Sequence, residues 1–307
     1  MKNHLAALCA AIAACGLFVG GAAQSQELEP RAFSPGPTGF NIAAVSGAYS
    51  SGDLVFDAAL PIKDATGNSK SVGVGYQRFF GLFGKTAKFA VAGAWADGHA
   101  EGLVGGQNRV RDMQGFTDPR LGVSWIFFGA PAMAPAQYSK YRPTTVSGVS
   151  FGVSPPVGQY DRTRVINIGT NRWTFRSQFG VAHYWQRWMA EGTLGGQFFT
   201  GNDEYYPGSA KQSQNPVGSV QGHVSYAFKP QMWIAASATY YRGGATSVDG
   251  VPTPGFQSNS RYGVSGSMPL TRGQALGLNY SRGLSTRSGS NYDTVIVTWL
   301  VKWFDRK

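Results

Sequence analysis

The chain has 307 residues, and its 27 Lys and Arg against 16 Asp and Glu give a formal charge of +11 at neutral pH. Charged residues make up 14% of the chain, against roughly 25% in an ordinary soluble domain, while Gly and aromatic residues are abundant. So little charge cannot cover a large soluble globule, and so many aromatic residues argue against disorder. Composition therefore disfavours both a soluble helical enzyme and a disordered tail.

Residues 1–25 have the pattern of a signal peptide that is removed on export. An apolar run from Leu5 to Ala23 follows a positive start and ends in small residues, so we expect cleavage after Ala23 or Ser25. A retained membrane anchor is one alternative, because the run is long, and lipidation of Cys15 is another. Removal of this segment takes both cysteines with it, which excludes disulfides and thiolate metal ligands from the mature protein.

Apolar side chains recur at every second position along the mature chain. Between residues 295 and 303, for example, Val or Trp occupies every odd position. Successive side chains of a strand point to opposite faces, so one face is apolar and the other is polar or small. Each segment has about ten residues, enough for a tilted strand to cross a bilayer. Twelve such segments begin near Gly39, Val72, Thr86, Arg120, Thr144, Trp173, Trp188, Gly218, Met232, Arg261, Gln274 and Tyr292.

The connections between these segments alternate between long and short. Long polar links follow the odd segments, at roughly residues 50–69, 97–117, 155–172, 200–216 and 242–259. Short links follow the even segments, at 81–85, 186–187, 229–231 and 269–273, with residues 129–143 as a longer exception. Outer-membrane barrels have short periplasmic turns and longer external loops. We therefore predict an all-β protein, a closed antiparallel transmembrane β-barrel of about 12 strands in the outer membrane of a Gram-negative bacterium.

The predicted barrel spans residues 39–304, and the parity of its strands places both ends in the periplasm. A Pro-rich periplasmic N-terminal segment, residues 26–38, precedes the barrel and can enter its lumen from the periplasmic side. A periplasmic tail, residues 305–307, follows the barrel. Closure is expected because an open strand edge in lipid leaves backbone groups unpaired. The alternative is a β-sandwich whose aromatic residues fill its core.

One hairpin has a register that the sequence predicts. With a two-residue turn at 186–187, Trp185 faces Trp188, and Phe179 pairs with Leu194 and Phe175 with Phe198, apolar on apolar. On the opposite face Arg176 then pairs with Gln197 and Ala182 with Glu191. A slip of one residue would mix the faces. Aromatic residues also gather near strand ends, where amphipathic rings favour the headgroup level. The predicted membrane-interface aromatics are Trp173, Trp185, Trp188, Trp299 and Trp303.

The polar phase of the strands supplies the residues that we expect to line the lumen. They are Arg120, Arg176, Gln178, Glu191, Gln197, His223 and Arg261. Charge inside a barrel lines a water path or forms internal ion pairs. Other inward positions are small, among them Gly148, Gly180 and Gly263, which leaves either a narrow bore or room for an inserted segment. Eight-strand barrels are filled and 16-strand barrels are open, so twelve strands allow both.

Basic residues are in excess at the short-turn end, whereas the charges of the long links nearly balance. Such cations meet anionic phospholipid headgroups, so outer-membrane lipids are expected partners, together with the outer-membrane assembly machinery. The basic residues are scattered singly over turns, so we expect no nucleic-acid partner.

The sequence contains no familiar catalytic, cofactor or metal motif, so we expect no enzyme, no cofactor and no metal site. His223 and Ser225 share one strand face, but residues two apart on a strand are separated by about 7 Å. A membrane-embedded lipid hydrolase would need a Ser and a His within hydrogen-bond reach, so it is the least favoured alternative. His183 falls in the lipid-facing phase near Trp185.

Eight short pieces of the mature chain together resemble one family. They are ELEPRAFSPGPTGFN (27–41), TDPR (117–120), GAPAM (129–133), GQYD (158–161), NIGTNRW (167–173), HVSYAF (223–228), YYRGG (240–244) and NSR (259–261). The family is described as "Putative MetA-pathway of phenol degradation" and comprises exported barrels often called transporters in genomes linked to aromatic breakdown. The resemblance implies an outer-membrane barrel, suggests uptake of aromatic or other small molecules, and accounts for the long 129–143 link. It assigns no transport residues.

The leading hypothesis is a channel for passive uptake of small solutes, aromatic or hydrophobic ones among them, linked to aromatic-compound degradation. Arg120, Arg176 and Arg261 would favour anions such as aromatic carboxylates. The alternative is a structural or adhesive closed barrel without transport, whose lumen is filled by ion pairs and the N-terminal segment.

Overall fold

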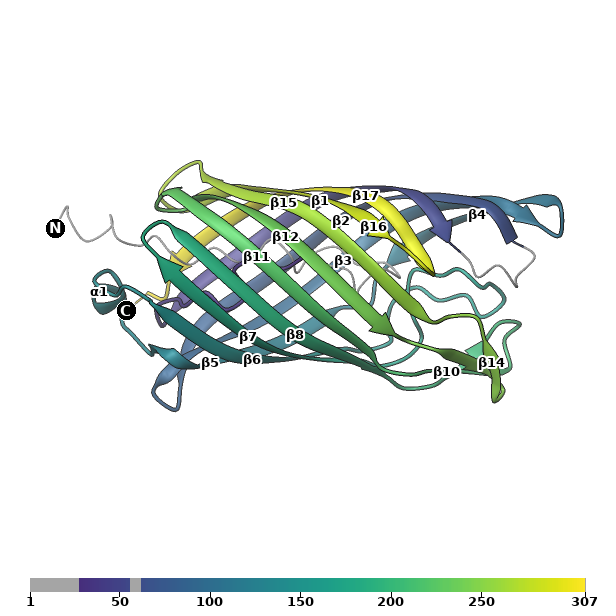
Figure 1. Ribbon diagram of the computed structural model, residues 1–307, viewed down its shortest axis with the longest axis horizontal. Helices are drawn as coiled ribbons and strands as arrows, with labels where there is room; N and C mark the ends of the chain where they lie inside the picture. Colours follow the sequence, from purple (N-terminus) through teal and green to yellow (C-terminus); the bar gives the residue numbers. More distant parts are fainter. Residues whose placement is uncertain (1–27, 56–61, 307) are drawn as a thin grey trace.

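The chain folds into one closed antiparallel β-barrel (Figure 1). The computed structural model describes residues 28–55 and 62–306, so the predicted signal peptide at 1–25, with Cys15, lies outside the described residues. Strand β1 pairs with β17 on one side and with β2 on the other, and β2 pairs in turn with β3, which closes the sheet. The described residues contain no helix that is long and apolar enough to cross a membrane.

Twelve strands form the ring, which confirms the predicted architecture. The largest difference in bounds is at β2, which begins at Ile62 and not near Val72. The ring consists of β1 (Phe40–Val55), β2 (Ile62–Leu82), β3 (Lys85–Val104), β5 (Arg120–Pro131), β6 (Thr145–Ser154), β7 (Thr174–Trp185), β8 (Trp188–Phe199), β11 (Val217–Lys229), β12 (Met232–Gly243), β15 (Gln257–Pro269), β16 (Gln274–Ser285) and β17 (Gly289–Phe304).

Two of the predicted long links are largely strand. Residues 62–71 belong to β2, residues 97–104 belong to β3, and β4 (Gln107–Phe116) pairs with the outer part of β3 as a hairpin. In this region polar side chains occupy both faces, so the alternation that marks a half-apolar strand is lost. The backbone pairing continues nevertheless, and this is why the side-chain pattern alone predicts loops there.

Shorter elements complete the connections. The links after β8 and β12 form a second, four-stranded sheet at the long-loop end, made of β9 (Asn202–Tyr205), β10 (Ala210–Gln214), β13 (Thr246–Val248) and β14 (Val251–Thr253). The long exception among the short links contains the single-turn helix α1 (Pro135–Tyr138), which lies at the opposite end of the barrel (Figure 1).

The register predicted for the β7–β8 hairpin is confirmed. Trp185 faces Trp188, and further along the two strands Phe179 faces Leu194. The two polar residues Arg176 and Gln197 also lie opposite each other, as expected. Because the two faces meet lipid and lumen respectively, this register places the large apolar side chains Phe175, Phe179, Leu194 and Phe198 together on the outer face.

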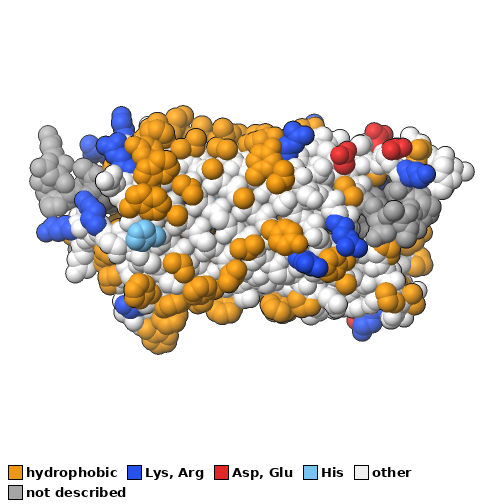
Figure 2. All heavy atoms as spheres, in the orientation of Figure 1, with side chains coloured by type: hydrophobic (Ala, Val, Ile, Leu, Met, Phe, Trp, Pro, Cys, Tyr) orange, Lys and Arg blue, Asp and Glu red, His pale blue; other side chains and the backbone are white. Residues whose placement is uncertain are grey.

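Large hydrophobic side chains are exposed over the outside of the barrel between its two ends (Figure 2). All five predicted interface tryptophans are exposed on this surface: Trp173, Trp185, Trp188, Trp299 and Trp303. Trp185 and Trp188 flank the 186–187 turn, whereas Trp173 precedes β7 at the other end. His183 also faces outward and stacks on Trp185 with a centroid distance of 5.9 Å.

The lipid-facing assignment of β8 predicts a specific loss of stability. Leu194 is 61% exposed halfway along the strand, and we expect Leu194→Arg to lower the free energy of unfolding by about 2–4 kcal/mol. The cost arises because the guanidinium group would lose its hydration in hydrocarbon. Leu270→Arg makes the same replacement in the 270–273 turn, where we expect a cost of about 0–1 kcal/mol. Urea unfolding in phospholipid vesicles measures both, and equal losses would contradict the assignment.

Candidate functional site in the barrel lumen

The seven residues predicted to line the lumen all lie on the inward phase of their strands. Glu191, His223 and Arg261 are buried. The other four, Arg120, Arg176, Gln178 and Gln197, are half-buried. They do not form one cluster, because the interior is divided by the N-terminal segment, whose described part is residues 28–38.

This N-terminal segment lies inside the barrel at the short-turn end. Its aromatic ring, Phe33, is 1% exposed and occupies the space beside two inward glycines. A Cβ atom added at Gly148 or Gly180 would lie 2.7 or 2.2 Å from that ring. A Cβ atom added at Gly263 would likewise lie 2.7 Å from the Leu28 side chain. The small inward residues therefore make the room that the inserted segment fills.

Polar groups on two separate strands of the wall hold the segment in place. The Glu191 carboxylate accepts the backbone N–H of Ala32 at 3.0 Å and that of Phe33 at 3.4 Å. From β3, the Lys88 ammonium donates to the Ala32 carbonyl at 2.6 Å. The segment is thus bound to β8 and β3 through a single dipeptide, and both charged side chains bond to its backbone groups.

Residues on either side of this dipeptide contact β11, β12 and α1. The Arg31 guanidinium donates to the Ser225 hydroxyl at 3.1 Å and lies 5.4 Å from the ring centroid of Trp233. At the barrel entrance, the Tyr138 hydroxyl donates to the Pro35 carbonyl at 2.8 Å. The helix α1 therefore packs on the inserted segment, which gives a physical reason for the unusual length of the 129–143 link.

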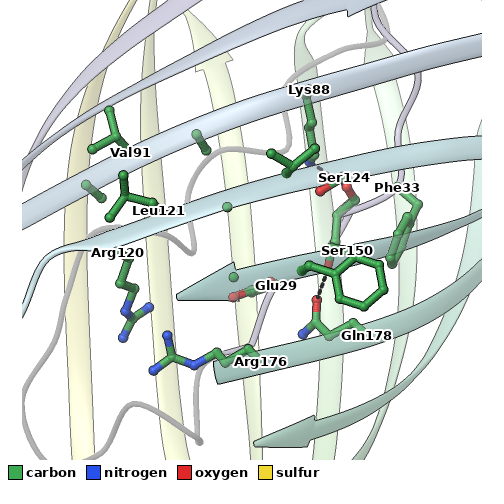
Figure 3. Close-up of a pocket in the computed structure, with 17 residues that line it drawn as sticks. Glu29, Phe33, Lys88, Val91, Arg120, Leu121, Ser124, Ser150, Arg176 and Gln178 are labelled. Carbon is green, nitrogen blue, oxygen red and sulfur yellow. Dashed lines mark hydrogen bonds between the residues drawn. The ribbon is translucent and has the colours of Figure 1, made fainter. Parts of the chain in front are cut away.

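A cavity remains between the segment and the wall formed by β3, β5, β6 and β7 (Figure 3). The guanidinium groups of Arg120 and Arg176 point toward one another in it, and Glu29 and Phe33 of the segment lie on its other side (Figure 3). Gln178 also lines it and accepts a hydrogen bond from the Ser150 hydroxyl at 3.1 Å. The charged residues that line the cavity are thus three cations, Arg120, Arg176 and Lys88, and one acid, Glu29.

Arg261 does not share this cavity. Its side chain is 5% exposed and donates to the Ser281 hydroxyl at 3.2 Å and to the Tyr292 carbonyl at 2.7 Å. These bonds fix it against β16 and β17, on the other side of the inserted segment. Arg261 therefore faces inward as predicted but lies apart from Arg120 and Arg176, because local alternation shows the face of a residue and not its partners.

His223 has a serine partner on the neighbouring strand and not Ser225 on its own strand. Its Nδ1 atom lies 2.8 Å from the Ser237 hydroxyl of the neighbouring strand, while Ser225 accepts the bond from Arg31. His223 is 2% exposed and Ser237 is 6% exposed. The two side chains are therefore within hydrogen-bond reach, and both are buried in the interior.

The long-loop end holds a residue that the pattern analysis missed. Asp118 is 3% exposed, and its carboxylate accepts three hydrogen bonds from the link between β6 and β7. The donors are the Gly158 N–H at 2.8 Å, the Thr170 N–H at 2.8 Å and the Thr170 hydroxyl at 2.7 Å. Three of the family-like motifs, at 117–120, 158–161 and 167–173, meet here. Their shared resemblance to the family was the feature of the sequence that could have identified Asp118.

The same link is tied to the loop after β8. Arg172 lies 4.4 Å from the ring centroid of Phe199 and donates to Gln214, and Asn171 donates to Asn202 at 2.9 Å. Burial lowers the pKa of Arg172 to about 10, so it stays charged at neutral pH. The outer connections therefore form one bonded rim beside the opening.

A closed antiparallel barrel with an apolar exterior, a polar interior and short turns at one end is a barrel of the outer-membrane type. The family described as "Putative MetA-pathway of phenol degradation" matches residues 47–299, and the chain belongs to this family.

Solved structures are similar to the chain at the level of the fold. The COG4313 outer membrane channel from Pseudomonas putida F1 has 17% sequence identity and a TM-score of 0.74, covering 90% of this chain and 99% of that chain. The translocator domain of the autotransporter NalP from Neisseria meningitidis has 12% identity and a TM-score of 0.50, with 87% and 89% coverage. A comparison with curated proteins finds no match.

Proposed function

We propose that the protein is a channel for passive uptake of small solutes across the outer membrane of a Gram-negative bacterium. The apolar belt and the loop asymmetry support this location, and export after removal of residues 1–25 supplies the route to it. The similar barrel from Pseudomonas putida is described as an outer membrane channel. We propose no catalytic step and no cofactor.

The observation that carries the proposal is the cavity beside the inserted segment. Three cations, Arg120, Arg176 and Lys88, line the cavity against one carboxylate, Glu29, so the cavity attracts an anionic group. The buried Phe33 ring adds an apolar surface to the lining, and aromatic carboxylates combine both features. The family description links the chain to aromatic-compound degradation, which agrees with this solute class.

Ion selectivity tests the role of the two arginines. In the double variant Arg120→Gln/Arg176→Gln, we expect the ratio of anion to cation permeability to fall by at least about threefold, because the variant removes two positively charged side chains from the lumen. Reversal potentials in planar bilayers under a salt gradient measure this ratio. The matched control Arg109→Gln/Arg162→Gln removes two exposed arginines of the outer connections and should leave the ratio unchanged. A wild-type protein without conductance or liposome flux would overturn the proposal.

The second candidate is a closed structural or adhesive barrel. The burial of residues 28, 30–31 and 33–37 inside the lumen favours it, because this segment occupies space that a solute would need. Removal of the segment separates the two candidates.

A further inference from the structure

Each connection at the short-turn end of the barrel carries at least one basic side chain. We name six of them the basic rim: Lys85, Arg142, Arg187, Lys229, Arg272 and Arg306. All except the half-buried Lys85 are exposed, and blue side chains gather at this end in Figure 2. Among the described residues, Asp305 is the exposed acidic residue at this end, and it pairs with Arg78 at 2.7 Å. The basic rim is therefore not neutralised by neighbouring carboxylates.

Lipid-facing aromatic residues lie directly beside these cations. Lys229 follows Phe228, which is 47% exposed, and Arg187 stands between Trp185 and Trp188, each 43% exposed. Aromatic belts mark the boundary between hydrocarbon and headgroups. The cations of the basic rim consequently lie at the depth of the lipid phosphates.

We propose that the basic rim binds the headgroups of anionic phospholipids, of the phosphatidylglycerol or cardiolipin class, in the leaflet at the short-turn end. Each Lys or Arg near such a surface gains attraction, and here the cations are distributed singly around the circumference. That arrangement matches a shell of boundary lipids. An acidic protein would instead need its cations gathered on one contiguous patch.

The opposite end of the barrel does not share this property. Its exposed cations are balanced by nearby acids, as in the pairs of Lys211 with Asp203 at 3.1 Å and of Arg162 with Glu204 at 3.7 Å. Paired charges attract a lipid surface weakly. The barrel is thus polarised along its axis, with anionic phospholipid preferred at one end only.

Native mass spectrometry of the full-length mature protein from nanodiscs of equal phosphatidylglycerol and phosphatidylcholine tests the proposal. We expect wild type to retain phosphatidylglycerol in clear excess. In the rim variant Arg187→Gln/Lys229→Gln/Arg272→Gln this excess should fall by at least about threefold. The control Lys63→Gln/Arg109→Gln/Lys211→Gln removes three exposed cations from the other end and should keep the wild-type excess.

The heat-dependent mobility shift of a folded barrel on gels verifies that each variant is closed before lipids are counted. An equal lipid ratio in wild type, or an undiminished excess in the folded rim variant, would overturn the proposal. So would an equal loss in the control variant. Binding of polyglutamate to the rim without a lipid preference would assign the surface to an acidic protein, and the lipid proposal would be wrong.

Discussion

Removing residues 26–38, so that the mature chain begins at Gly39, is expected to raise the single-channel conductance of the reconstituted barrel several-fold. The reason is geometric: twelve strands enclose more space than their inward side chains fill when so many of these are small. In this barrel the N-terminal segment fills that space, with Phe33 beside Gly148 and Gly180. Planar-bilayer recordings of the truncated and intact proteins measure the change.

A single substitution tests the same contact while keeping the backbone of the segment. Phe33→Ala removes a ring that is 1% exposed, a type of change that costs about 3–5 kcal/mol in a packed interior. We expect longer or more frequent openings, with the fully open level of the truncated protein. Phe83→Ala is the matched control, because Phe83 is 83% exposed on the outside at the same end and should leave the openings unchanged.

The two candidate functions give different results in these recordings. Intact protein with a small conductance that grows on truncation supports a channel with a fitted constriction. Intact protein without conductance that opens on truncation supports a closed barrel that the segment seals. Identical conductance before and after truncation would contradict the assigned position of residues 28–38 in the path.

The fold was predictable from sequence because the membrane imposes one rule on every strand. A side chain such as Leu194 must face lipid and its neighbour Thr193 must not, so alternation marks the strands, their phase and even the β7–β8 register. The rule ends where the strands leave the membrane. Residues 62–71 are paired strand, yet their side chains do not alternate between apolar and polar, so the pattern does not reveal the strand.

The contents of the lumen were predictable only as a list of inward residues. The bond from the Ala32 N–H to Glu191 joins positions 159 residues apart, and no local pattern encodes that distance. Alternation correctly predicts that Glu191 faces inward. It does not predict whether the carboxylate contacts water, a cation or a backbone N–H. Asp118 was missed for a related reason, since it lies between β4 and β5, where the alternation is interrupted.

Asp118→Ala is expected to release the link between β6 and β7 from its position beside the outer opening. The substitution leaves the Gly158 N–H, the Thr170 N–H and the Thr170 hydroxyl without their acceptor. A buried donor without a partner costs about 1–3 kcal/mol, so the link gains more by moving into water than by staying. The strands themselves lose no ladder bond, and the barrel should remain closed.

Hydrogen exchange followed by mass spectrometry measures this release. Peptides covering residues 158–170 should exchange at least about tenfold faster in Asp118→Ala, since a tenfold change corresponds to only about 1.4 kcal/mol of lost protection. Asp203→Ala is the matched control, because that carboxylate is 74% exposed and pairs with Lys211 on the surface. Its removal should leave the exchange of 158–170 unaltered. Unchanged exchange in Asp118→Ala would mean that the ties from Asn171 to Asn202 and from Arg172 to Gln214 suffice to fix the link.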